Sequence, residues 1–173
     1  MLDSEILTDN DFMNIIDKYL KDEKVQCLKN IPHHDSNRLN HCLKVSHLSY
    51  KICKKLNLNY ESAAKAGLLH DFYYNRVNDY NYMNDKVKLF TDGHPEDAVK
   101  NAEKRFYLTN LEKDIIVSHM WPISTHIPRY KESFVVSISD KVFSVKEFGK
   151  KWNYSLSFRF GVYFLLFTNF LFK

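Results

Sequence analysis

The chain has 173 residues with a formal net charge of +4, and 45 % of its residues are hydrophobic. This balance excludes a disordered chain and is typical of a single globular domain. Only 4 Gly and 4 Pro occur, too few for the many tight turns of a β-sandwich or barrel. The lysines are scattered and the net charge is small, so we expect no nucleic acid as a partner.

The cysteines and the first residues indicate the compartment. Cys27, Cys42 and Cys53 are odd in number and form no CxxC pair, which favours buried thiols in a reducing environment. Residues 1–5 are acidic and lack an apolar run, so they do not resemble a signal peptide. We therefore expect a cytoplasmic protein.

Apolar residues recur with helical spacing along most of the chain, which predicts an all-α helical bundle. The expected helices contain residues 12–19, 41–52, 63–70, 98–106, 115–119 and 134–148. Residues 8–11 are typical of a helix start, Pro95 suits a first helical turn, and Thr109 with Glu112 forms a capping box. The polar stretch 72–93 is expected to be a loop or short irregular helices, and so long a loop is usually functional or mobile.

The domain organisation follows from these elements. Residues 1–150 are expected to form one helical core, and residues 151–173 form a separate hydrophobic segment. The apolar run 160–167 is too short to span a membrane, which takes about 20 apolar residues. Three roles stay open for this segment: packing on the core, a homodimer interface, or, less favoured, membrane association.

Six polar residues lie on or beside the apolar faces of these predicted helices. They are His41, His70, Asp71, His94, His119 and Asp140. Burying carboxylates is costly unless a cation or a hydrogen-bond donor compensates them. Imidazoles and carboxylates suit Mn, Fe, Co, Ni or Zn, and the lack of neighbouring thiolates argues against a structural zinc site. The pattern therefore predicts a buried site for divalent metal ions.

The same six residues carry a family resemblance. Their order, with Leu68 and Leu69 before His70-Asp71 and Ser139 and Lys141 around Asp140, resembles the HD-domain superfamily of metal-dependent phosphohydrolases. The likeness covers about residues 31–148 and is strongest to small stand-alone bacterial members. It implies an all-α fold with the site between antiparallel helices.

The resemblance also implies a ligand set. His41, His70, Asp71 and Asp140 would hold one metal ion, and His94 and His119 would bind a second ion that shares the Asp71 carboxylate. In the alternative there is one ion, and His94 and His119 contact phosphate or transfer a proton. Two ions are expected here, of Fe, Mn or another transition metal such as Co, Ni or Zn.

One departure from the family concerns the phosphate contact. Many two-metal members have His-Asp-x-Gly-Lys, but Tyr73 and Tyr74 stand where the Gly and Lys would be. The replacement candidates for binding substrate are Arg129, which we prefer, and Lys141, Arg76, Lys44 and His126. The pair His33-His34 is expected to face solvent rather than to line the site.

These observations predict a metal-dependent phosphohydrolase that cleaves a phosphomonoester or phosphodiester, with a small nucleotide-like substrate and a metal-activated water. Asp71, His94 and His119 are the expected catalytic residues. The alternative is a module that binds a metal or a nucleotide with little or no turnover. No P-loop or nucleophilic Ser or Cys motif is present to favour another class of enzyme.

Overall fold

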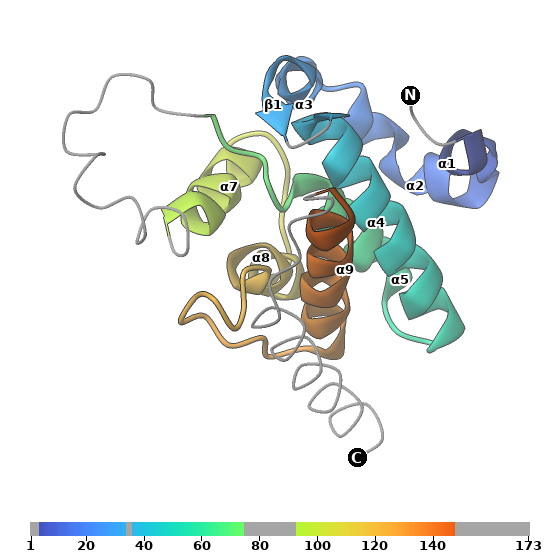
Figure 1. Cartoon of the computed structure of the whole chain (residues 1–173). Coiled ribbons are helices and arrows are strands. Elements are labelled where there is room, and N and C mark those ends of the chain that lie inside the picture. The colour runs from blue at the N-terminus through green and yellow to red at the C-terminus, as the bar shows by residue number, and fades with distance from the viewer. Residues whose placement is uncertain (1–3, 34–35, 75–92, 148–173) are drawn as a thin grey trace.

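The computed structural model describes residues 4–33, 36–74 and 93–147 of the chain. The predicted all-α class is confirmed, and helices account for nearly all of the regular structure (Figure 1). The helices are α1 (Ser4–Thr8), α2 (Asn10–Leu20), α3 (Glu23–Gln26), the 3-10 helix η1 (Cys27–Asn30), α4 (Arg38–Lys55), α5 (Tyr60–Leu69), α7 (His94–Glu103), α8 (Asn110–Ser118) and α9 (Lys131–Glu147).

One small β element was not predicted. Strands β1 (Pro32–His33) and β2 (Ser36–Asn37) pair antiparallel, with His33 opposite Ser36. They lie directly before α4, and the backbone N–H of Arg38 donates to the Ile31 carbonyl at 3.0 Å. The pair therefore fixes how the chain enters the first long helix.

Side-chain caps begin several helices, at residues 8–11 and 109–112 as the sequence suggested, and also at Asn59, which was not predicted as a cap. Asp9 accepts a hydrogen bond from the Phe12 N–H, and Asn59 accepts one from the Ser62 N–H. The Thr109–Glu112 capping box is present in both directions. Such caps satisfy backbone N–H groups that a helix leaves unpaired at its N-terminus.

Helix α4 forms the centre of the bundle and packs on α5 and α9, while α8 packs on α5, α7 and α9. Helices α4 and α5 approach closely at Gly67, where an added Cβ would lie 3.0 Å from the Ser46 Cα. Ser46 Oγ also donates to the Ala64 carbonyl at 2.6 Å. This contact fixes the spacing of the two helices that carry His41 and His70.

Several expectations concern residues outside the described part. They are residues 75–92 of the expected loop 72–93, with Arg76 among them, and the hydrophobic segment 151–173. Within the three described stretches, no helix combines the length and the apolar character needed to cross a bilayer.

The close approach at Gly67 makes a stability prediction. Gly67→Val should destabilise the protein by about 2 kcal/mol, because its side chain meets the backbone of α4 rather than a movable side chain. Glu61→Val, at an exposed position of the same helix, is the control for the helix propensity of Val and should change stability much less. Urea unfolding of the two variants measures the difference, and equal losses would contradict the tight contact.

Candidate metal centre

The six predicted ligands converge in the bundle interior. His41 comes from α4, His70 and Asp71 follow the end of α5, and His94 begins α7. His119 follows α8, and Asp140 lies within α9. Each of the six is at most 6 % exposed. The structure thus brings together residues that span 100 positions of the sequence.

Two of the histidines are oriented by the same backbone device. His70 Nδ1 lies 2.8 Å from the Gly67 carbonyl, and His119 Nδ1 lies 2.7 Å from the Ile116 carbonyl. A carbonyl only accepts hydrogen bonds, so each Nδ1 carries the proton and donates it. Each neutral ring therefore keeps its lone pair on Nε2, the atom that faces the centre, as a metal ligand requires.

Three donor atoms form a compact triangle on one side of the centre. His94 Nε2 and His119 Nε2 lie 3.2 Å apart, and each lies 3.5 Å from Asp71 Oδ1. The point equidistant from these atoms is about 2.0 Å from each, the usual length of a bond from a transition metal to nitrogen or oxygen. The triangle therefore has the size of one face of a metal coordination sphere.

The other side of the centre is built around Asp140. His41 Nε2 lies 3.0 Å from Asp140 Oδ1, and His70 Nε2 lies 3.8 Å from the same oxygen. His70 Nε2 is also 3.8 Å from Asp71 Oδ2. The two oxygens of Asp71 consequently face different sides of the centre, Oδ1 toward His94 and His119 and Oδ2 toward His70.

Buried polar atoms support the fit to a cation. Among the described residues, His70 Nε2 and Asp71 Oδ1 are buried and make no hydrogen bond. Such atoms are rare in folded proteins and are often explained by an ion. The groups His41–His70–Asp140 and His70–Asp71–His119 each place their ligand atoms within 4.8 Å of one another. These residues could hold divalent metal.

The protonation states also suit metal binding. Burial lowers the pKa of His70 to about 4. Burial would raise the pKa of Asp140, but the Lys141 ammonium 2.9 Å away and the His41 hydrogen bond lower it well below its ordinary value. The pKa of Asp71 is likewise lowered, since the surrounding imidazoles outweigh the effect of burial. The pKa of His119 is also lowered by burial, so near neutral pH the centre offers at least two neutral imidazoles and two ionised carboxylates.

The comparisons with known proteins agree with this geometry. The family model for the HD domain matches residues 38–143, which run from the first residue of α4 into α9. The chain belongs to the HD domain family. HD domains bind divalent metals, and the superfamily generally contains metal-dependent hydrolases. No curated protein and no solved structure matches the chain.

The predicted substrate residues of this HD domain occupy varied positions. The Lys141 ammonium is buried, donating to the His119 carbonyl at 2.6 Å and to Asp140 Oδ2 at 2.9 Å, so its visible role is to hold two parts of the centre. The Arg129 side chain is 84 % exposed beside Asp114. His126 is half-buried, with Nε2 3.9 Å from Glu96 Oε1, and Lys44 is half-buried on α4.

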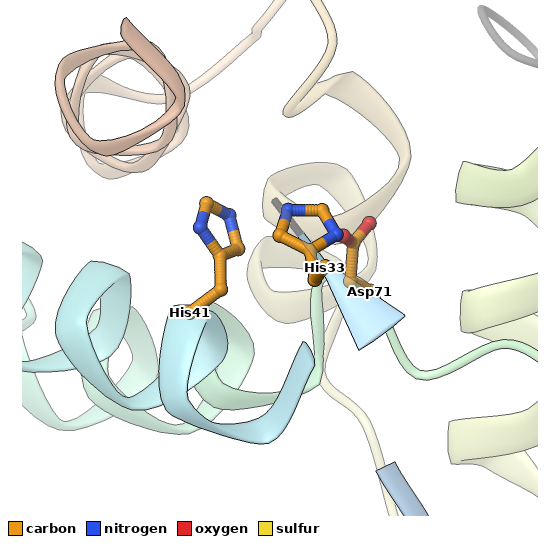
Figure 2. A group of neighbouring side chains, drawn as sticks. All are labelled: His33, His41 and Asp71. Atoms are coloured by element: carbon orange, nitrogen blue, oxygen red, sulfur yellow. The ribbon is translucent and has the colours of Figure 1, made fainter. Parts of the chain in front are cut away.

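His33 is the residue that sequence reasoning misplaced. It was expected to face solvent, but it is half-buried and its ring centroid lies 4.4 Å from that of His41. Figure 2 shows its ring beside His41 and Asp71. The cause is the β1–β2 pair, whose two-residue strands are too short to leave a periodic signal in the sequence. His34 lies outside the described residues.

Sequence reasoning also missed that Arg38 and Tyr73 lie beside the candidate metal centre. The Arg38 guanidinium carbon lies 3.9 Å from the centre of the Tyr73 ring, and Nη1 donates to the Tyr73 carbonyl at 2.6 Å. The Tyr73 ring centroid in turn lies 4.9 Å from that of His94. Tyr73, at the position of the family's Gly, therefore supports a predicted ligand.

The lowered histidine pKa predicts how stability depends on pH. The folded, metal-free protein keeps His70 neutral down to about pH 4, whereas the unfolded chain protonates it near 6.5. The unfolded state therefore binds more protons between these values, and stability is lost as the pH falls below 6.5. His119 contributes in the same direction, and the two carboxylates do so below about pH 4.

We expect the free energy of unfolding in chelator to fall by about 2 kcal/mol from His70 alone between pH 7 and pH 5. Urea titrations at the two pH values measure this loss. His70→Gln should show a smaller loss of stability, whereas Asn14→Gln, a change at an exposed position of α2 without a titratable group, should show the same loss as the parent. Equal pH dependence in His70→Gln and the parent would contradict a buried neutral His70.

Proposed function

We propose that this HD domain is a phosphohydrolase that uses a pair of divalent metal ions to cleave a phosphomonoester or phosphodiester, with a small nucleotide-like compound as substrate. The observation that carries the proposal is the triangle of His94 Nε2, His119 Nε2 and Asp71 Oδ1, whose edges of 3.2–3.5 Å match a metal coordination sphere. This donor set is distinct from the one around Asp140, so it supports two ions rather than one.

The proposed ligands divide between two positions. His41, His70 and Asp140 would hold the first ion with Asp71 Oδ2, and His94 and His119 would hold the second with Asp71 Oδ1. Divalent cations in such a site supply acidification of a water molecule and neutralisation of charge on phosphoryl oxygens. Iron or manganese are the ions that we propose first, with Co, Ni and Zn as further candidates.

The protein's own groups would then orient and protect this chemistry. The Gly67 and Ile116 carbonyls hold two rings with Nε2 directed inward, and Lys141 fixes the Asp140 carboxylate. Because all six ligands are buried, bulk water is excluded and electrostatic interactions are stronger than in solvent. Asp71, His94 and His119 are proposed as the residues nearest to the reacting phosphorus.

The phosphate contact of this chain would differ from the common family arrangement. Tyr74 stands where the family's Lys is, and its hydroxyl donates to the Lys24 carbonyl at 2.8 Å. The Lys141 ammonium already has two partners. The exposed guanidinium of Arg129 is therefore our first candidate for binding phosphate, with His126 and Lys44 as further candidates.

The absence of the family's Gly-Lys pair favours one alternative function. Without the Gly-Lys pair, the centre would bind a metal or a nucleotide with little turnover. Hydrolysis of an aryl phosphate and a bis-aryl phosphate, with Mn²⁺ added, separates the two functions. Turnover supports the phosphohydrolase, whereas tight metal or nucleotide binding without turnover supports the binding module.

Removing the metal should abolish the activity. We expect EDTA to stop hydrolysis and added Mn²⁺ to restore it, since the proposed chemistry depends on the cation. Asp17→Ala, which removes a half-exposed surface carboxylate of α2, is the control and should behave as the parent does. Full activity in protein shown by elemental analysis to lack metal would contradict the proposal.

Metal counts should distinguish two ions from one. The parent is expected to hold about two ions per chain, His119→Ala about one, and Asp71→Ala close to none. Asp71→Ala removes a ligand from both positions. It also removes the negative charge that would offset the repulsion between the two cations. Elemental analysis after dialysis measures the counts. A parent that saturates at one ion, with His119→Ala unchanged, would move His119 out of the ligand set.

A further inference from the structure

We propose that His33 is a further ligand of the cation bound by His41 and Asp71, a role that extends the proposed metal centre and depends on it. The ligand atoms of His33, His41 and Asp71 all lie within 4.8 Å of one another. Ligand atoms on a shared ion lie up to about 4.2 Å apart when each bond is about 2.1 Å long. A small side-chain rotation therefore places the three around one ion.

The backbone holds His33 in this position. β1 pairs with β2, so Pro32 lies opposite Asn37, and the Asn37 side chain caps α4 by accepting from the Asn40 N–H at 3.0 Å. His41 lies one turn into that helix. The β1–β2 pair and the first turn of α4 are thus connected, and the side chain of His33 lies beside that of His41 although the two come from different elements.

Residue orientation along β1 supports the assignment. Successive residues of a strand point to opposite sides, and here Pro32 is exposed while His33 is half-buried. The His33 ring is tilted by 44° to the His41 ring, so the two are not stacked face to face. In Figure 2 the His33 imidazole lies between His41 and Asp71, with a nitrogen directed toward the Asp71 carboxylate. A residue that only filled space would not require an imidazole there.

Ligation by His33 has a consequence for the proposed reaction. It adds a nitrogen donor to the ion that His41, His70, Asp71 and Asp140 would hold, and it leaves that ion fewer positions for water or substrate. The ion beside His94 and His119 would then be the more accessible of the two. His33 would also connect the β1–β2 pair, the one β element among the described residues, to the metal centre.

The first test measures metal affinity. Mn²⁺ is titrated into parent, His33→Phe, His33→Gln and Asp17→Ala in competition with a chromophoric chelator. Both His33 variants should weaken the affinity for one ion by about 10- to 100-fold, and Asp17→Ala, a change at the surface of α2, should match the parent. His33→Phe preserves an aromatic ring against His41, and unfolding in chelator identifies the variant that keeps the parent's stability. Parent-like affinity in a folded His33 variant would overturn the proposal.

The second test gives the ligand a spectroscopic signature. His33→Cys is loaded with Co²⁺, and a thiolate that binds cobalt produces a near-ultraviolet charge-transfer band. The band should be present in His33→Cys and absent from the parent, and its absence together with parent-like affinity in the first test would overturn the proposal. His41→Ala is the reference for the centre itself. If the parent and His41→Ala both fail to bind metal, the proposed function fails as well. If the parent binds metal and His41→Ala does not, a negative result concerns only the role of His33.

Discussion

The structure depends on keeping two carboxylates ionised in the dry interior of a helical bundle. Asp71 and Asp140 are 5 % exposed, and burial of unpaired carboxylates costs several kcal/mol. Lys141 offsets this cost at Asp140. Asp71 faces Nε2 atoms of the surrounding imidazoles and its Oδ1 makes no hydrogen bond, so a bound cation would offset the cost there. The helices around these two carboxylates pack closely, and α4 and α5 meet at Gly67 without an intervening side chain.

The imidazoles of His70 and His119 are oriented in the same way, each at the C-terminus of a helix. The last carbonyls of a helix have no partner within the helix. His70 and His119 each cap the helix that precedes them, and each donates Nδ1–H to the carbonyl three residues earlier. One hydrogen bond therefore satisfies a carbonyl, fixes the tautomer and directs Nε2 into the centre. Removing this hydrogen bond at either position would therefore leave a helix carbonyl unpaired and would also free the orientation of the imidazole.

Local signals carried most of what the sequence could predict. Apolar spacing and capping residues such as Asp9 and Thr109 identify the helices because both depend on neighbours within about four positions. The six predicted ligands could be identified because polar residues on buried faces need a compensating partner. The position of His33 depends on a β pair too short to show periodicity, and the burial of the Lys141 ammonium depends on the His119 carbonyl, which lies 22 residues away. Such nonlocal contacts leave no pattern in the sequence.

His94 is supported differently from the other histidines. It begins α7, so no preceding helical carbonyl of that helix is available to orient its ring. Its ring instead packs beside Tyr73, which stacks on the buried guanidinium of Arg38. Tyr73, at the position of the family's Gly, therefore links a predicted ligand to the buried guanidinium of Arg38. Tyr74, at the position of the family's Lys, likewise makes a contact within the fold, because its hydroxyl donates to the Lys24 carbonyl. Under the proposed function, positive charge for phosphate would come from the metal ions and from exposed groups such as Arg129.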